Sequence, residues 1–202
     1  MFEKLILAQE YNTMLRLIFR ILFVLKGYKF DYNFPKEAER CVLICAPHTS
    51  NWDFVFAIAV FSKLKIPYRF TIKDDWTKFP FGLLINPLGA IGINRKPKAD
   101  GEKRESMVEA MARLFKENDE LALLVTPEGT RKKVDELKSG FYYVAQQAKV
   151  PMTLGYIDYK NKIAGIKEVI SYEQSYDEVK NEMYDFFSKI EGKNNELNSF
   201  VR

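Results

Sequence analysis

Short apolar runs and longer stretches with helical periodicity alternate along most of the chain. The short runs predict strands at residues 42–46, 68–72, 90–94, 121–125, 152–159 and 163–170. Apolar residues at helical spacing predict helices at 51–64, 102–116 and 138–149, and a last helix that begins after Ser175. Apolar strands that alternate with helices are typical of a parallel sheet with both faces covered. The pattern therefore predicts a single α/β domain with a largely parallel central sheet covered by helices.

The segment before the first strand has a different pattern. Residues 14–25 are apolar except for Arg16 and Arg20, which lie one helical turn apart. A helix over this run rises only ~18 Å, which is short of a hydrocarbon core of ~30 Å. We therefore expect an amphipathic helix in the membrane interface, with both arginines at the headgroups. The side chains expected in the acyl region are Leu15, Ile18, Phe19, Leu22 and Phe23. A helix packed on the core is the alternative.

Composition narrows the class of protein. Of 202 residues, 47% are apolar, which excludes a disordered chain, and the 16 Phe and 11 Tyr indicate an apolar surface or cavity beside an aromatic core. The net charge of +4 fits an anionic partner or membrane surface, and without a basic stripe it does not indicate nucleic acid. Cys41 and Cys45 are expected to be core thiols of a cytosolic protein. One histidine and no Cys-x-x-Cys predict no metal site.

The only histidine, His48, follows the first predicted strand of the sheet and precedes a helix. Ser50 and Asp53 have the spacing of a helix capping box, which places Asp53 in the first turn and close to the imidazole. The carboxylate can then accept a hydrogen bond from one ring nitrogen and leave the other to take a proton. The pair can thus form a general base with its orienting group. The alternative is that Asp53 only caps the helix.

Polar and cationic residues follow the next three predicted strands. In chain order they are Lys73, Asn94, Arg95, Glu128, Gly129, Thr130 and Arg131. Because ligands of open α/β sheets bind beyond the carboxyl ends of the strands, these residues should gather near His48. Guanidinium groups bind phosphate oxygens in a bidentate fork, and a glycine lets the backbone approach a ligand. The sequence thus predicts a base beside a phosphate site, although a solvated surface charge remains the alternative for each cation taken alone.

Four segments together resemble the ordered motifs of the glycerophospholipid acyltransferases, which include lysophosphatidic acid and glycerol-3-phosphate acyltransferases. They are His48-x4-Asp53, residues 89–95 (GAIGINR), residues 127–131 (PEGTR) and residues 150–151 (VP). The resemblance spans residues 43–154, and Lys73 before residues 79–82 also resembles the family. Pro47 stands where the family often has Asn, and Gly92 where a bulky apolar residue is usual. Both departures bear on the identity of the acceptor more than on the reaction.

The resemblance implies a role for each motif. His48 would be the general base, oriented by Asp53. Arg95 and Arg131 would hold the phosphate of the acceptor, and residues 150–151 would help to line the acyl site. The implied substrate-binding residues are Lys73, Asn94, Arg95, Glu128, Gly129, Thr130 and Arg131.

The sequence as a whole predicts an acyltransferase of phospholipid biosynthesis. It would move a fatty acyl group from acyl-CoA or acyl carrier protein to a hydroxyl of a glycerol phosphate lipid, with lysophosphatidic acid as the favoured acceptor. Residues 1–34 would be the amphipathic helix and connector and 35–202 the acyltransferase domain, peripheral or monotopic on the cytoplasmic face of a membrane. No metal or bound cofactor is predicted. The alternatives are another lyso-lipid or aminolipid acceptor, a hydrolase, and a non-catalytic lipid-binding protein.

Overall fold

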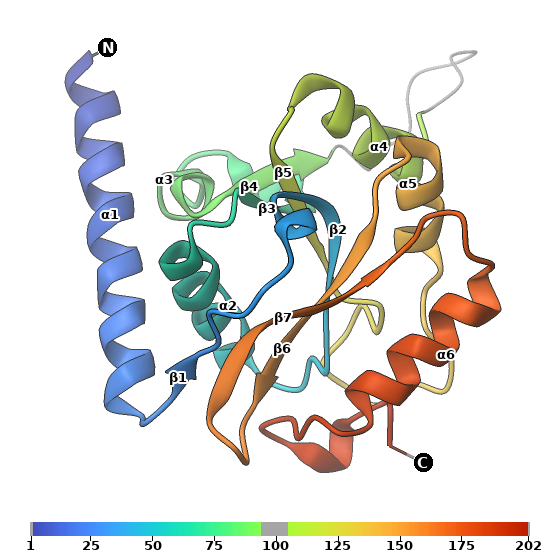
Figure 1. The fold of residues 1–202 in the computed structure, drawn as a ribbon. Coiled ribbons are helices and arrows are strands. Elements are labelled where there is room, and N and C mark those ends of the chain that lie inside the picture. The colour runs from blue at the N-terminus through green and yellow to red at the C-terminus, as the bar shows by residue number, and fades with distance from the viewer. Residues whose placement is uncertain (1, 94–104, 202) are drawn as a thin grey trace.

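The computed structural model describes residues 2–93 and 105–201 as alternating helices and strands (Figure 1). The α-helices are α1 (Phe2–Leu25), α2 (Asn51–Leu64), α3 (Gly82–Ile85), α4 (Met107–Glu117), α5 (Gly140–Ala148) and α6 (Tyr176–Phe187). The strands are β1 (Lys29–Phe30), β2 (Arg40–Cys45), β3 (Tyr68–Lys73), β4 (Ala90–Ile93), β5 (Leu121–Val125), β6 (Met152–Asp158) and β7 (Ile163–Ile170). Short 3-10 helices are η1 (Lys36–Glu39), η2 (Asp74–Thr77), η3 (Asn86–Leu88) and η4 (Asn195–Leu197).

The described strands form one sheet in the order β1-β7-β6-β2-β5-β3-β4. Strands β6 and β7 form an antiparallel hairpin, and the other neighbouring pairs are parallel. The central strands β2, β5 and β6 are mostly buried, as their continuous apolar sequences require. The predicted single α/β domain with a largely parallel sheet is therefore confirmed.

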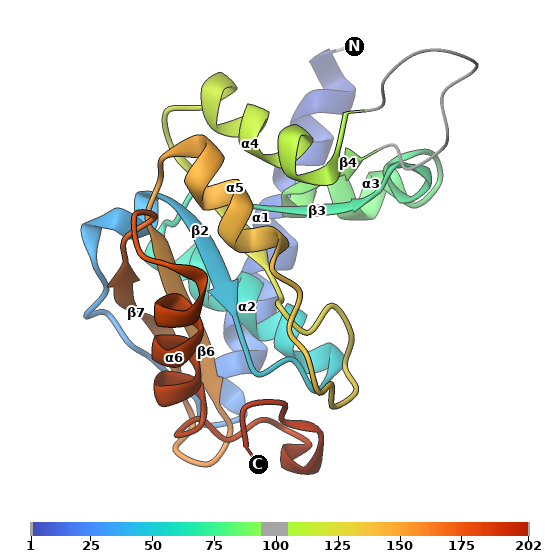
Figure 2. The same ribbon diagram turned by 90° about the vertical axis from the view of Figure 1, so that its right-hand side faces the viewer.

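Helices cover both faces of this sheet (Figure 2). One face packs against α4, α5 and α6, and Val42 and Ile44 of β2 point into that core. The other face packs against α1 and α2, and Cys41 and Leu43 point there. This alternation follows from the two-residue period of a strand. Both thiols lie on the second face, as their sequence parity predicts.

Most elements lie where the periodicity predicts them, but the short strand β1 is not predicted, β2 begins at Arg40 rather than at residue 42, and several helix ends differ. Helix α2 has the predicted bounds. Helix α4 begins at Met107, where Ser106 and Glu109 form a capping box that fixes its first turn, and the predicted start at residue 102 lies outside the described residues. Helix α1 begins at Phe2 rather than at Met14. Residues 2–13 contain many good helix formers but lack the continuous apolar run on which the prediction depended.

The inner face of α1 corrects the prediction for its arginines. Arg20 donates from Nε to Ser62 Oγ (3.0 Å) and from Nη2 to the Ser62 carbonyl oxygen (2.5 Å). The Arg16 guanidinium lies over the Tyr68 ring, 5.4 Å from its centroid. Both arginines therefore face the protein rather than lipid headgroups. Their guanidinium groups have acceptors on neighbouring elements, because Arg16 Nη2 donates to the Pro87 carbonyl oxygen at 3.5 Å and Arg20 donates to Ser62.

The outer face of α1 is apolar instead. Its exposed side chains, each between 41% and 77% accessible, are Met14, Leu17, Ile18, Ile21, Val24 and Leu25. Among the residues that the structure describes, no helix combines the length and the apolar character needed to cross a membrane. The prediction for the acyl-facing side chains is therefore wrong for Leu15, Phe19 and Phe23, which pack in the core, whereas Ile18 is exposed. One side of α1 packs on α2, as the alternative prediction has it, and a different set of apolar residues forms the exposed side.

Candidate active site

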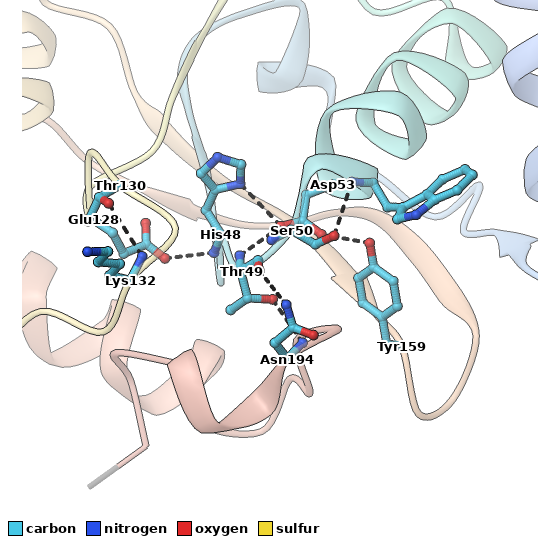
Figure 3. Close-up of polar contacts among 10 residues, drawn as sticks. His48, Thr49, Ser50, Asp53, Glu128, Thr130, Lys132, Tyr159 and Asn194 are labelled. Atoms are coloured by element: carbon cyan, nitrogen blue, oxygen red, sulfur yellow. Dashed lines mark hydrogen bonds and ion pairs between the residues drawn. The ribbon is translucent and has the colours of Figure 1, made fainter.

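The loop that carries His48 connects β2 to α2 at the carboxyl edge of the sheet. The predicted capping box is present, with Ser50 as the N-cap residue and Asp53 in the first turn of α2. Asp53 Oδ2 accepts hydrogen bonds from the backbone N–H groups of Thr49 and Ser50, both at 2.8 Å. The same oxygen lies 3.2 Å from His48 Nδ1 (Figure 3). Capping the helix and contacting the imidazole are therefore one arrangement rather than two alternatives.

Tyr159 supplies a further donor to Asp53 that the sequence analysis missed. It follows β6, and its hydroxyl donates to Asp53 Oδ1 at 2.6 Å. Burial, together with the nearby Asp53 carboxylate, raises the pKa of Tyr159 far above its usual range, so the phenol stays protonated and remains a donor. Both carboxylate oxygens of Asp53 are thus engaged. The rule that points to strand ends would have reached Tyr159 as well, because β6 ends at the same edge as β2.

Glu128 supports the histidine from the other side. Its Oε1 accepts from the backbone N–H of His48 at 2.8 Å, and the side chain is almost fully buried. Burial raises the pKa of this carboxyl group, although the hydrogen bond from His48 opposes the shift. In this structure Glu128 therefore holds the His48 loop. Substrate binding by Glu128, which the resemblance implies, stays a prediction.

The segment after α6 also fastens this loop. Asn194 donates from Nδ2 to the Thr49 carbonyl oxygen (2.9 Å) and from its backbone N–H to Thr49 Oγ1 (3.3 Å). Gly192 permits the close approach, because a Cβ there would lie 2.9 Å from Thr49 Oγ1. No motif in the sequence indicates this contact, which joins residues 145 positions apart.

An apolar cavity of about 150 Å³ opens beside His48, between α2 and the sheet. Polar groups on its wall come from His48, Asp53, Thr126 and Arg131. Apolar wall residues include Phe54, Ala57, Ile58, Phe61, Tyr68, Phe70, Leu124 and Ile157. His48, Arg131 and a set of apolar side chains therefore line the same cavity.

The other predicted site residues have different surroundings. Gly129 has a φ of +63°, and Thr130 Oγ1 accepts from the backbone N–H of Lys132 at 3.4 Å, so both shape the turn that presents Arg131. Lys73 forms an ion pair with Asp75 at 2.9 Å and does not line the cavity. Asn94 and Arg95 lie outside the described residues. Substrate binding by these residues stays a prediction.

Residues 150–151 do not line this cavity, and a part for them in the acyl site stays a prediction. Val150 is buried in the core on the opposite face of the sheet, and Pro151 immediately precedes β6. Both therefore lie at the amino end of that strand, whereas His48 lies beyond the carboxyl end of its parallel neighbour β2. Sequence motifs give the order of segments along the chain, but they do not give the edge of the sheet at which each segment lies.

Cys45 is the thiol nearest to His48 in the sequence, and it lines the cavity. Burial raises the pKa of the Cys45 thiol well above its ordinary value, with smaller contributions from Cys41 and Glu128. A neutral thiol is a poor nucleophile. These surroundings favour a packing role for Cys45.

A comparison with protein families decides between the classes of enzyme that such a site could serve. The family described as Acyltransferase matches residues 29–153, which is more than half of the chain. The chain belongs to the Acyltransferase family. No curated protein sequence matches it. As an acyltransferase of lipid biosynthesis, the protein takes a lipid acceptor and an acyl donor as substrates. The range matched in this acyltransferase contains His48, Asp53, Glu128 and Arg131, whereas Tyr159 and Asn194 lie after it.

Proposed function

We propose that this acyltransferase transfers a fatty acyl group from a thioester donor to a hydroxyl of a phosphate-bearing glycerolipid, with lysophosphatidic acid as the first choice of acceptor. The observation that carries the proposal is the His48–Asp53 pair beside an apolar cavity that Arg131 also lines. The apolar wall suits a fatty acyl chain, and a guanidinium group suits a phosphate.

The chemistry is a direct transfer with His48 as the base. Asp53 engages Nδ1, so Nε2 is the nitrogen that takes the proton of the acceptor hydroxyl. The oxygen attacks the thioester carbonyl carbon and forms a tetrahedral intermediate. The carbon–sulfur bond then breaks, and the leaving thiolate takes the proton back from the imidazolium ring. No covalent acyl-enzyme is needed, and both acyl-CoA and acyl carrier protein supply a suitable thioester.

We also propose that the protein binds the surface of a membrane peripherally through the outer face of α1. Exposed aromatic and aliphatic residues continue this face on η2, α3 and the turn between them, namely Trp76, Phe79, Phe81 and Leu83. Helix α1 packs against the adjoining η3, so the two groups of apolar residues are neighbours (Figure 1). Exposed apolar side chains on neighbouring elements are typical of an interaction site, and a lipid acceptor enters from a bilayer.

The first experiment measures thiol release from an acyl-CoA with and without lysophosphatidic acid. We expect release that depends on the acceptor, and we expect His48→Ala to lower kcat by a factor of about 100 or more, since general-base catalysis contributes 10²–10⁴-fold. Circular dichroism and thermal unfolding of the variant check that it remains folded. Near-normal turnover in folded His48→Ala protein excludes this mechanism. Release without acceptor indicates a hydrolase, and no release with or without acceptor indicates a binding protein.

A further inference from the structure

Three lysines from distant parts of the chain surround Trp52. Lys26 follows α1, Lys162 lies in the turn between β6 and β7, and Lys193 follows α6. Lys26 Nζ and Lys193 Nζ lie 4.6 and 5.2 Å from the centroid of the Trp52 ring. Lys162 Nζ donates to the Lys26 carbonyl oxygen at 3.2 Å. Figures 1 and 2 both place the end of α1, the β6–β7 turn and the C-terminal segment at the same end of the molecule.

These lysines line a pocket of about 240 Å³ that is distinct from the cavity beside His48. The rest of its wall is aromatic: Tyr28, Trp52, Phe56 and Tyr159. Phe56 and Tyr28 are buried, so the floor of the pocket is fixed by the core. Contact of an ammonium group with an indole face is favourable, which holds two of the cations at the rim.

No carboxylate in the described part of the chain forms an ion pair with these three lysines. Glu191, the nearest acidic residue in sequence to Lys193, pairs with Lys160 at 2.7 Å instead. Asp158 accepts hydrogen bonds from the backbone N–H groups of Lys160 and Asn161 and from the Asn161 side chain. Asp53 is engaged by His48, its own helix and Tyr159. Ammonium groups that converge without a counter-charge repel one another, and an anion between them relieves that repulsion.

The pocket adjoins the catalytic pair. Trp52 precedes Asp53 on α2, and Tyr159 both lines the pocket and donates to Asp53. Figure 3 shows Tyr159 on one side of His48 and the Glu128 loop on the other. Arg131, to which we assign the phosphate of the acceptor, lines the cavity beside His48 and does not line the lysine pocket. The lysine pocket is therefore a second cationic group, separate from the first.

We propose that Lys26, Lys162 and Lys193 form a binding site for a phosphate group beside the active site. Lysine ammonium groups bind phosphate as point charges, and the aromatic floor suits a planar or apolar part of the same ligand. Two sources carry this chemistry: the nucleotide of a CoA thioester, and the headgroup of an anionic lipid next to the exposed Leu25. The nucleotide source rests on the proposed acyl transfer, whereas phosphate binding itself does not.

Trp52 gives a direct readout of the site. The chain has two tryptophans, so Trp76→Phe leaves Trp52 as the only indole. Titrating this variant with inorganic phosphate, adenosine 3′,5′-bisphosphate and CoA should give a saturable change in fluorescence, as the anion draws ammonium groups off the ring. Adding Lys26→Gln, Lys162→Gln and Lys193→Gln should weaken binding about tenfold or more. Since these lysines are exposed, the variant should fold normally.

A matched control replaces three exposed lysines on other elements, Lys36, Lys63 and Lys116, with Gln and should leave the titration unchanged. Two further arms identify the source. A nucleotide source raises KM for acyl-CoA in the triple variant at unchanged acceptor KM. A lipid source leaves both KM values unchanged but removes the preference for phosphatidylcholine vesicles that contain phosphatidylglycerol over those that do not.

Because the titrations need no turnover, they remain readable even if acyl transfer itself fails. The proposal is overturned if neither the phosphate probes nor the anionic vesicles give a saturable response. It is also overturned if the control variant loses as much binding as the pocket variant.

Discussion

Asp53 accepts hydrogen bonds from more groups than its role as a helix cap requires. Two backbone N–H groups, the imidazole and the Tyr159 hydroxyl share its two oxygens. A carboxylate held in this way cannot rotate without losing several hydrogen bonds, each to a charged group. The imidazole therefore keeps one orientation, with Nδ1 toward Asp53. Tyr159 acts on the reaction only through Asp53, so we regard it as a positioning residue.

Tyr159→Phe tests this role. Removing a hydrogen bond to a charged group costs about 1.5–3 kcal/mol, and we expect kcat to fall about tenfold while both KM values change little. Tyr142→Phe is the matched control, because its hydroxyl bonds to Gln174 and Gln146 on the opposite face of the sheet. The control should lose thermal stability but keep kcat. A Tyr159→Phe enzyme that loses only stability would show that Tyr159 is structural.

The thiol of Cys45 gives a second test at this scale. Because burial raises its pKa well above the ordinary value, the thiolate fraction stays small as the pH rises from 7 to 9. Alkylation by iodoacetamide in the folded enzyme should therefore be slow over this range, and it should become fast in denaturant. Cys45→Ala should retain transfer, with a packing loss of about 1 kcal/mol. An acyl-thioester trapped on Cys45 in a quenched reaction would reveal a two-step route instead.

The sequence predicted the local part of the site better than its long-range part. His48, Asp53 and the capping box lie within six residues, where helix geometry alone fixes their distances. Tyr159 and Asn194 reach the same loop from positions more than 100 residues away, and only the strand order brings them there. The lysine pocket is harder still to predict from the sequence, since each lysine by itself has the sequence pattern of a solvated surface charge.

At the scale of elements, periodicity predicted the sheet and its covering helices but not the orientation of α1. Both sides of this helix are apolar, and two arginines mark a stripe that periodicity assigns to solvent. In the structure Arg20 donates hydrogen bonds to Ser62 and Arg16 lies over the Tyr68 ring, so the arginine stripe faces the protein interior. Amphipathicity gives a direction only when the charged residues lack acceptors within the fold.

The outward apolar face leads to a prediction about membrane binding. Leu17→Glu with Ile21→Glu places two charges on residues that are about half exposed, so thermal stability should change little. Sedimentation with phospholipid vesicles should fall severalfold, because each buried apolar side chain contributes about 1.5–3 kcal/mol. Binding that is unchanged in this variant would assign the face to another partner.

Arg20→Ala is the matched control on the inner face of the same helix. It removes two hydrogen bonds to Ser62 and should lower the free energy of unfolding by about 1–3 kcal/mol. Vesicle binding and its dependence on salt should stay as in the parent protein, because Arg20 does not face the lipid.

At the scale of the whole molecule, two separate cationic groups lie near the catalytic pair. Arg131 projects from the loop after β5, and the lysine pocket lies beyond Tyr159. Arg131 lines the apolar cavity beside His48, whereas the three lysines line a different pocket. Two phosphate-bearing substrates could thus bind near one base without competing for the same charges.

The two KM values of Arg131 variants test this division. Arg131→Ala should raise KM for lysophosphatidic acid about tenfold or more and leave KM for the acyl thioester nearly unchanged, since a lost charged hydrogen bond costs about 1.5–3 kcal/mol. Arg131→Lys should restore the KM for lysophosphatidic acid only in part, because a point charge cannot replace the guanidinium fork. A defect confined to the thioester would reassign Arg131 to the donor and leave an aminolipid acceptor as the better hypothesis.

The inward arginines of α1 also bear on how a water-soluble variant for crystallisation should be designed. Removing α1 would strip Ser62 of its guanidinium partner and uncover the aromatic side chains that pack against Phe23. A truncated enzyme would therefore expose a new apolar surface in place of the old one and tend to aggregate. Replacing the exposed apolar residues of α1 with polar ones removes the exposed apolar surface. Keeping Arg16, Arg20 and Phe23 preserves the packing of α1 against the rest of the protein.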